Sequence, residues 1–294
     1  MSRLLPLVVL FLGCAAPPPP AASAGAAGAP CDDAPPLAQA TTAAEVRCAL
    51  GAGADPDAQT ADNGRTVLHD AAANGLDGVV AALLDGGADP AAATDRGMTP
   101  LHVASTPAAV QALVAAGADL EAAAEYGHTP LHWAITRGDA GALRALVAAG
   151  AALDATDEDG APLMVHAVTY AGADAATLAL LVELGADPAA AHDGRTALHA
   201  AAGNDDPETV RALLGLGFDP DAPTLDAYAQ RPLHLAFLFG VEASAVPVLL
   251  AAGADPRATD GDGRTPLSVA EAAEGGDYWE ADEALAALRA ALAE

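Results

Sequence analysis

Histidine is the residue of this sequence best suited to chemistry, because an imidazole can bind a metal or transfer a proton near neutral pH. Five of the eight histidines occupy the same position of a recurring segment of the type Thr-Pro-Leu-His: His69, His102, His132, His199 and His234. A zinc site needs ligands that converge on one point, whereas these five recur one per segment. The sequence therefore predicts a structural role for them, and no metal site.

The other three histidines depart from this position. His128 and His192 fall on predicted hairpin tips, where contact with solvent and contact with a partner are both reasonable. His166 stands two residues beyond the motif position of a worn copy of the segment, Gly160-Ala161-Pro162-Leu163-Met164.

Other catalytic and cofactor chemistry finds little support. The few serines lie near predicted helix boundaries rather than in a Gly-x-Ser-x-Gly segment, and the glycines occupy turns rather than a phosphate-binding loop. Asp260-Gly261-Asp262-Gly263 resembles the start of a calcium loop, but Thr265 replaces the glycine required at the sixth position. Asp157-Glu158-Asp159 is similarly acidic, and both runs suit turns, with weak cation binding as the alternative. We expect no enzyme activity and no cofactor.

The histidine segments are spaced at a regular period, which indicates one structural unit stacked on itself. Gly64 and Gly97, which open two copies, are 33 residues apart, and Gly127 opens another 30 residues later. A second signal of the type Gly-Ala-Asp-Pro recurs after most copies. Threonine can cap a helix and proline suits its first position. Glycine can end the second helix, and proline then prevents its continuation.

Thr-Pro-Leu-His-x-Ala at this period resembles the ankyrin repeat. The resemblance implies an all-α solenoid of helix–turn–helix units with β-hairpin tips, and its motif histidine belongs to a hydrogen-bonded framework between neighbouring hairpins. We expect an N-terminal half-repeat cap over Thr41 to Asp57 and about seven repeats, numbered one to seven below. Their approximate ranges are 61–93, 94–123, 124–155, 156–190, 191–223, 224–258 and 259–294.

The region before the repeats has a different composition. Residues 1–14 read as a signal peptide, with Arg3 before a short apolar run, and the end of this run resembles a bacterial lipoprotein box that would lipidate Cys14. Ordinary secretion, with cleavage in the Ala-rich stretch from 21 to 29, is the alternative. Residues 15–36 read as a disordered tether rich in Ala and Pro, and 37–294 as the repeat domain. In an oxidising compartment Cys31 and Cys48 would form a disulfide. We expect an envelope protein held at a membrane only by its lipid.

The net charge of −28, from 12 basic and 40 acidic residues, argues against nucleic-acid binding. The same charge favours a basic partner protein. We expect a monomer that binds another protein through its hairpin tips and concave face. An inhibitor or immunity-type protein that occludes a toxin or wall-acting enzyme is the alternative within binding. An acidic, calcium-responsive spacer is the alternative of another class.

Arginine and aromatic residues are common at interfaces. They are scarce in this chain, yet several fall on the predicted tips or just behind them. The candidate contacts are Arg65, Arg96, Met98, Tyr126, His128, Trp133, Arg195, Tyr228 and Arg264.

Overall fold

The computed structural model describes residues 31, 35–239, 242–273 and 282–293. The chain divides into two units, Met1–Asp33 and Ala34–Glu294, and the second contains every helix and strand given below. The predicted signal segment with Cys14 lies outside the described residues, as does most of the predicted tether. None of the helices in the described part of the chain is long and apolar enough to cross a membrane.

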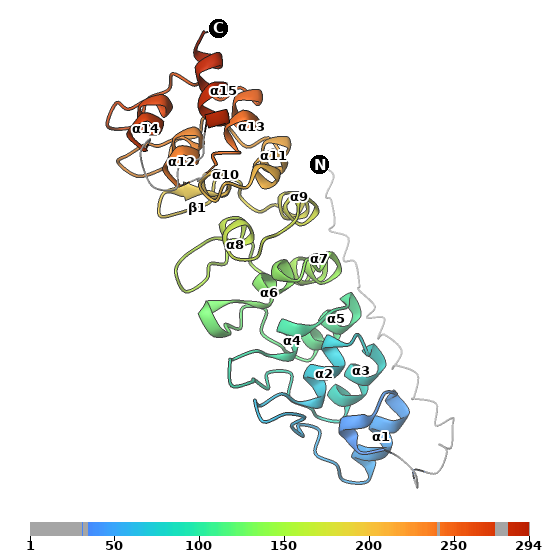
Figure 1. Cartoon of the computed structure of the whole chain (residues 1–294). Helices are drawn as coiled ribbons and strands as arrows, with labels where there is room; N and C mark the ends of the chain where they lie inside the picture. Colours follow the sequence, from blue (N-terminus) through green and yellow to red (C-terminus); the bar gives the residue numbers. More distant parts are fainter. Residues whose placement is uncertain (1–30, 32–34, 240–241, 274–281, 294) are drawn as a thin grey trace, which may run out of the picture. The chain divides into compact units, whose positions relative to one another are not determined.

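Short helices follow one another in pairs along the repeat domain (Figure 1). After η2 (Leu37–Gln39) and α1 (Ala43–Gly51), the pairs are α2 (Val67–Ala73) with α3 (Asp77–Asp85), α4 (Pro100–Val103) with α5 (Pro107–Ala115), α6 (Pro130–Thr136) with α7 (Ala140–Ala149), α8 (Leu163–Thr169) with α9 (Ala175–Leu184), α10 (Ala197–Gly203) with α11 (Pro207–Gly215), α12 (Pro232–Phe239) with α13 (Val246–Ala251), and α14 (Pro266–Ala273) with α15 (Asp282–Ala293). This confirms the predicted helical repeat solenoid.

The motif starts the first helix of a pair as its chemistry predicts. In α4, Thr99 is the N-cap with an extended backbone, and Pro100 follows in the first turn. The Thr99 amide donates to Nδ1 of His102 over 2.9 Å, and the Thr99 hydroxyl lies at the same distance from that nitrogen. The imidazole thus takes the place of the Glu or Gln of an ordinary capping box.

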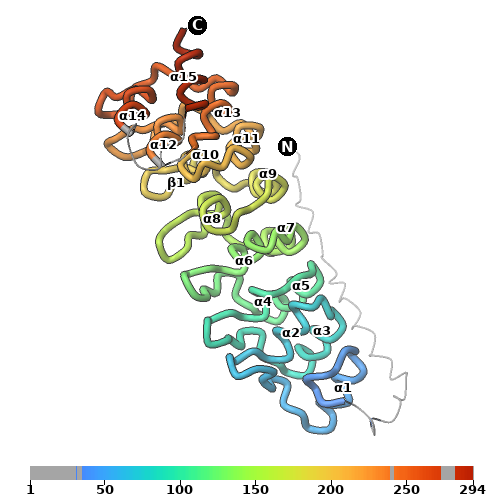
Figure 2. Tube along the Cα trace, in the orientation of Figure 1, coloured from blue at the N-terminus to red at the C-terminus, as the bar shows by residue number. Residues whose placement is uncertain are grey.

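The pairs stack so that each helix packs on the helix two before it and the helix two after it (Figure 2). First helices therefore form one row and second helices another, with the core between them. The inward residue of each first helix is fully buried, as Leu68, Leu101 and Leu131 show. Alanines such as Ala134 and Ala201 fill the rest of the interface, and their small side chains allow close stacking.

Backbone hydrogen bonds join successive hairpin tips. The Glu125 amide donates to the Arg96 carbonyl over 2.9 Å, and the Glu158 amide donates to the Tyr126 carbonyl over the same distance. The approach is so close that a Cβ on Gly127, whose φ is +72°, would lie 2.5 Å from the backbone nitrogen of Glu158. In repeat five the tip is a small antiparallel pair, β1 (Ala191–His192) with β2 (Arg195–Thr196). In repeat three it contains the single-turn η3 (Glu125–Gly127).

Repeat two has the shortened first helix that its length predicts, since α4 has only 4 residues. The end of this helix is completed by a side chain from the next repeat. The Arg137 guanidinium donates to the carbonyls of His102 and Ala104, over 2.6 Å and 2.8 Å. An arginine therefore satisfies carbonyls that a longer helix would bond internally.

The two ends of the repeat domain pack as expected for terminal repeats. In α1, Thr42 and Glu45 form a capping box, while Val46 is fully buried. In α15, Leu285 and Leu288 are buried on one face. Both end helices are amphipathic, as caps that face solvent must be.

Candidate functional site

The motif histidines link each repeat to the next. On the Nδ1 side each accepts a hydrogen bond from the backbone amide of its helix cap, so the Nε2–H must donate. Four of these Nε2 atoms bond a carbonyl of the following hairpin at 2.9–3.2 Å, namely His69 to Met98, His102 to His128, His199 to Gln230, and His234 to Arg264. Burial lowers the pKa of all four, and that of His102 falls to about 4. They are neutral framework groups, as the repeat motif predicts.

His132 is the exception among the motif histidines. Its Nδ1 accepts from the Thr129 amide over 3.2 Å, but its buried Nε2 has no hydrogen-bond partner in the described part of the chain. The equivalent carbonyl of the next hairpin is that of Ala161, and His132 does not reach it. Burial and the neighbouring His166 and His128 lower the pKa of His132 to about 3. The link between repeats three and four thus lacks the bond found at four other junctions.

Repeat four, which follows this junction, begins its first helix with a departure from the motif. Pro162 is the N-cap of α8, where it offers no side-chain oxygen for a cap bond. Val165 therefore occupies the third helical position, where the other repeats have histidine, and His166 follows it. The predicted two-residue displacement of His166 is thus wrong, because it aligned Pro162 with a helical proline rather than with the cap.

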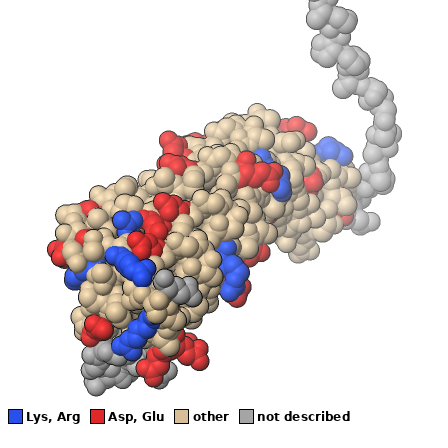
Figure 3. Space-filling model, turned by 90° about the horizontal axis from the view of Figure 1, so that it is seen from above, with Lys and Arg blue, Asp and Glu red and all other residues tan. Residues whose placement is uncertain are grey.

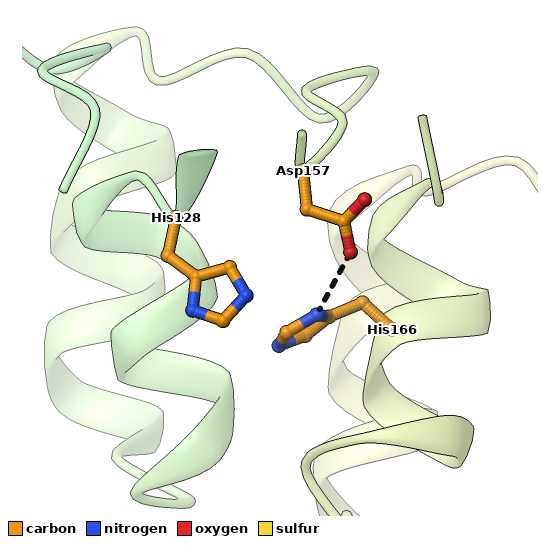
Figure 4. Close-up of side chains that lie close together, drawn as sticks. All are labelled: His128, Asp157 and His166. Atoms are coloured by element: carbon orange, nitrogen blue, oxygen red, sulfur yellow. Dashed lines mark ion pairs between the residues drawn. The ribbon is translucent and has the colours of Figure 1, made fainter. Parts of the chain in front are cut away.

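Histidine at position 166 rather than 165 brings three potential metal ligands together (Figure 4). His128 comes from the tip before α6, Asp157 from the next tip, and His166 from α8, and one ligand atom of each lies within 4.8 Å of the others. The His166 Nδ1 is 3.5 Å from Oδ2 of Asp157. The rings of His128 and His166 meet edge to face with centroids 4.7 Å apart. The expectation that no histidines converge with other ligands is therefore wrong for the described residues.

Burial makes this cluster unusual. His166 is only 1% exposed, and neither ring nitrogen has a hydrogen-bond partner among the residues that the structure describes. Its separation from Asp157 is in the range of an ion pair, but it is longer than a hydrogen bond. Desolvation by burial, followed by the nearby His128, lowers the pKa of His166, and Asp157 opposes this shift. His132 packs against the same ring with a centroid distance of 4.8 Å.

The Asp157 carboxylate has a useful counterpart three repeats later. Oδ1 of Asp157 accepts hydrogen bonds from the amides of Asp159 and Ala161, and Oδ1 of Asp260 likewise accepts from the amides of Asp262 and Arg264. At Asp260 the second oxygen is paired with the Arg264 guanidinium at 2.9 Å. At Asp157 the residue equivalent to Arg264 is Ala161, so the second oxygen faces histidines instead. The buried carboxylate lacks the arginine that its counterpart has.

A cavity of about 390 Å³ adjoins the cluster. Its lining comprises Tyr126, His128, Asp157, Asp159 and Tyr170. Tyr126 is 57% exposed and Tyr170 is 55% exposed, so two aromatic side chains stand at its rim. Tyr126 was a predicted contact residue, but Tyr170 was not. Tyr170 follows the last residue of α8, outside the tips, and no repeat pattern marks it.

The predicted arginine contacts mostly engage nearby acids. Arg65 pairs with Asp70 at 2.5 Å, and Arg96 pairs with Glu125 of the next tip at 3.2 Å. Arg264 pairs with Asp260, as described above. On the face shown in Figure 3, blue and red side chains lie beside one another in the same way. Arg195 lies close enough to Asp226 to lower the pKa of that carboxyl, after the larger effect of the Thr224 hydroxyl.

The remaining predicted contacts differ in exposure. Tyr228 is 56% exposed on the tip of repeat six, while Met98 is half-buried. Trp133 is half-buried on α6, and its buried indole nitrogen has no hydrogen-bond partner among the described residues. Arg96 and Tyr126 thus lie on successive tips, as predicted. Two exposed tyrosines, Tyr126 and Tyr170, lie together at the cavity.

Both cysteines within the described residues, Cys31 and Cys48, are disulfide-bonded in the structure. That they pair with each other stays a prediction. Lipidation of Cys14 also stays a prediction, because that residue lies outside the described part.

Comparisons with known proteins agree with this architecture. A family model described as "Ankyrin repeats (3 copies)" matches residues 37–124, 106–192 and 163–260. The crystal structure of the ankyrin repeat domain of Bcl-3, described as a unique member of the IkappaB family, superposes with a TM-score of 0.62 at 29% identity. That match covers 78% of this chain and 100% of the other. The human ASB11 ankyrin repeat domain gives a TM-score of 0.60 at 26% identity, over 76% of this chain and 99% of the other.

Two curated proteins match over shorter stretches. The ARF GTPase-activating protein Git of Drosophila melanogaster is 43% identical over 75 residues, which is 26% of this chain and 10% of that protein. The E3 ubiquitin-protein ligase KEG of Arabidopsis thaliana is 38% identical over 93 residues, which is 31% of this chain and 6% of that protein. The chain thus spans a tenth or less of the curated relatives it matches.

Proposed function

The chain belongs to the ankyrin-repeat family, and on that premise we propose that it binds a partner protein at the cavity between Tyr126 and Tyr170. Ankyrin repeats are generally non-catalytic scaffolds for protein–protein interaction. The observation that carries the proposal is the pair of tyrosines at the rim of the cavity, each more than half exposed in a chain that is only 3% aromatic. Tyrosine supplies large, rigid contact area and is enriched among residues that dominate binding energy.

The lining of the cavity indicates the partner's chemistry. Between the two tyrosines it offers Asp159, which is exposed, whereas the Asp157 side chain is only 4% exposed. An arginine or lysine side chain would meet both negative charge and aromatic faces there, which attract cations. The net charge of −28 would also raise the rate of encounter with a basic protein, and salt would lower that rate. The partner we propose is therefore a protein that inserts a basic side chain between the tyrosines.

Anchoring is a separate part of the proposal and rests on the sequence alone. The basic start, the short apolar run and the lipobox-like end at Cys14 support export and attachment through a lipid. A protein so attached should fractionate with membranes and enter detergent, and Cys14→Ala should release it or block its processing. A soluble native protein with an unmodified Cys14 would contradict the anchor, but it would leave the binding surface untested.

Site-specific photo-crosslinking tests the binding surface. A photoreactive phenylalanine analogue at position 126 or 170 should give the same discrete adduct in extracts of the native host. The same analogue at Asp85 or Glu183, which lie exposed on second helices, should not form it. Tyr126→Ala with Tyr170→Ala should weaken binding of the identified partner by roughly thirtyfold or more. Adducts at 85 and 183 with none at 126 and 170 would place the interface on the other side of the repeats.

A further inference from the structure

We propose that His128, Asp157 and His166 bind a divalent transition-metal ion, of which Zn²⁺ fits the ligands best, at the junction of repeats three and four. This proposal does not depend on partner binding, because all three ligands belong to this chain. It concerns the cluster of Figure 4, where the three side chains point toward one another from two tips and a helix.

The first support is geometric. Ligands about 2.0–2.1 Å from a tetrahedral zinc lie roughly 3.3–3.5 Å from one another. The edge between the His166 Nδ1 and the Asp157 Oδ2 is already 3.5 Å, and the remaining atoms lie within 4.8 Å. His128 has to make most of the adjustment, and it can do so because its side chain is half-buried on a tip rather than fixed in the core.

The second support is the unmet polar chemistry of the buried groups. A buried polar atom without a partner costs about 1–3 kcal/mol, so native proteins rarely leave one. His166 is 1% exposed, and within the described ranges neither of its ring nitrogens has a hydrogen bond. Its side chain points into the cluster (Figure 4). The side chain of Asp157, 4% exposed, lacks the arginine that neutralises Asp260. A bound cation would satisfy the imidazole and the carboxylate together.

The donor set selects the class of metal. Two imidazole nitrogens with one carboxylate oxygen suit zinc and its transition-metal neighbours, while calcium and magnesium prefer oxygen ligands only. Three protein ligands leave one position for water or for an incoming side chain. His128 and Asp157 both line the 390 Å³ cavity, so that position would be reached from its space.

The metal would also replace a missing structural link. At four junctions a motif histidine bonds the next hairpin, whereas His132 leaves its Nε2 without a partner. A metal held by His128 of repeat three and by Asp157 and His166 of repeat four would join the same two units. Binding should therefore raise the thermal midpoint of the protein.

The test uses the full chain with an affinity tag free of histidine, stripped of metal by a chelator. Isothermal titration should show one equivalent of Zn²⁺, and Co²⁺ should bind with a change in its visible absorption. His128→Ala should weaken Zn²⁺ binding at least tenfold, as loss of a ligand does. This variant keeps the backbone carbonyl that His102 bonds, so the fold should survive. His192→Ala is the matched control, because His192 is also a half-buried tip histidine, 3.6 Å from Asp193.

A second variant protects the test against a folding artefact. Asp157→Asn keeps an oxygen for the two amide bonds that Asp157 accepts but removes the charge, and it should also weaken Zn²⁺ binding tenfold or more. Circular dichroism should show that both variants remain helical. The proposal is overturned if the wild type takes up no Zn²⁺ at about 100 µM, a concentration that would fill a site with a Kd of about 10 µM or tighter. It is also overturned if His128→Ala binds like the wild type, or if His192→Ala is equally impaired.

Discussion

Mild acid should destabilise the repeats through their buried histidines, and His102 allows this effect to be isolated. Its Nδ1 accepts a hydrogen bond from the Thr99 amide, and its Nε2–H donates to the His128 carbonyl. A proton added to Nδ1 would replace an acceptor by a donor facing another donor. Burial, the larger cause, lowers the pKa from its ordinary 6.5 to about 4. The folded state therefore resists protonation that the unfolded chain accepts.

The difference in the pKa of His102 between the unfolded and folded states sets the size and sign of the change in stability. Above pH 7 both states are neutral at His102, and the free energy of unfolding does not depend on this group. As the pH falls below 6.5 the unfolded chain binds a proton while the folded chain stays neutral until about pH 4, so stability falls. At pH 5 the difference of 1.5 pH units amounts to about 2 kcal/mol, at ~1.4 kcal/mol per unit. His132, with a pKa of about 3, should add a similar loss.

Urea unfolding followed by circular dichroism at pH 7, 6 and 5 measures the effect. His102→Gln is the informative variant, because glutamine also forms a capping box with threonine but does not titrate. Wild type should be the more stable at pH 7, and its advantage should shrink by about 2 kcal/mol at pH 5. Since arrays can unfold unit by unit, hydrogen exchange at the Thr99 amide should be followed as well. Carboxylates contribute little over this range, because pH 5 lies above their ordinary pKa.

A neighbouring variant provides the control. Val103→Ala weakens the same helix without removing a titrating group, so its loss of stability should be the same at pH 7 and pH 5. The reasoning is refuted if wild type and His102→Gln lose the same stability between these two values. It is equally refuted if Val103→Ala changes the pH dependence as much as His102→Gln does.

Three further predictions concern the backbone and its links. Gly127→Ala should cost well over the 1–2 kcal/mol of a positive φ, because its Cβ would meet backbone at 2.5 Å, whereas Gly160→Ala has open space and should cost only that amount in the same urea assay. Arg137→Ala should lower the free energy of unfolding by about 1–2 kcal/mol through two lost carbonyl bonds, and an unchanged urea midpoint would contradict the capping role. Peptide mapping without reductant should find Cys31 joined to Cys48, with reduction costing about 3 kcal/mol, while two free thiols in purified native protein would contradict the pairing.

The sequence predicted the framework because each of its parts depends on local rules. Thr99 and Pro100 start a helix by capping chemistry that involves only the next few residues. Glycines such as Gly87 and Gly185 turn the chain with positive φ where the period places them. The shortness of α4 could be read from the length of repeat two. Such features recur at every period, so each copy supports the interpretation of the others.

The cluster could not be predicted, because it depends on departures from the period. The cap of α8 lies at the usual position, Pro162, but histidine stands at position 166, one residue after the usual motif position, and there it lies beside Asp157. Neither residue repeats elsewhere in the same combination. The ion pairs of the arginines could not be predicted either, since Arg96 pairs with Glu125, which lies 29 positions later in the sequence. Tyr170 reaches the cavity only because α8 ends where it does.

The hydrogen bonds between successive tips allow the fold to be conserved in evolution while the side chains on the tips change. They join the backbone of Glu125 to that of Arg96, and the backbone of Glu158 to that of Tyr126. Side chains can change without altering such bonds, except at positions of positive φ, which include the tip glycines and also Tyr126 (φ 63°). Exposed tip residues such as Arg96 and Tyr228 can therefore be substituted, which changes the surface of the repeats while the backbone of the stack stays the same. Whole repeats can be duplicated for the same reason, because the backbone of each copy already fits its neighbours and the side chains of its tip can then change.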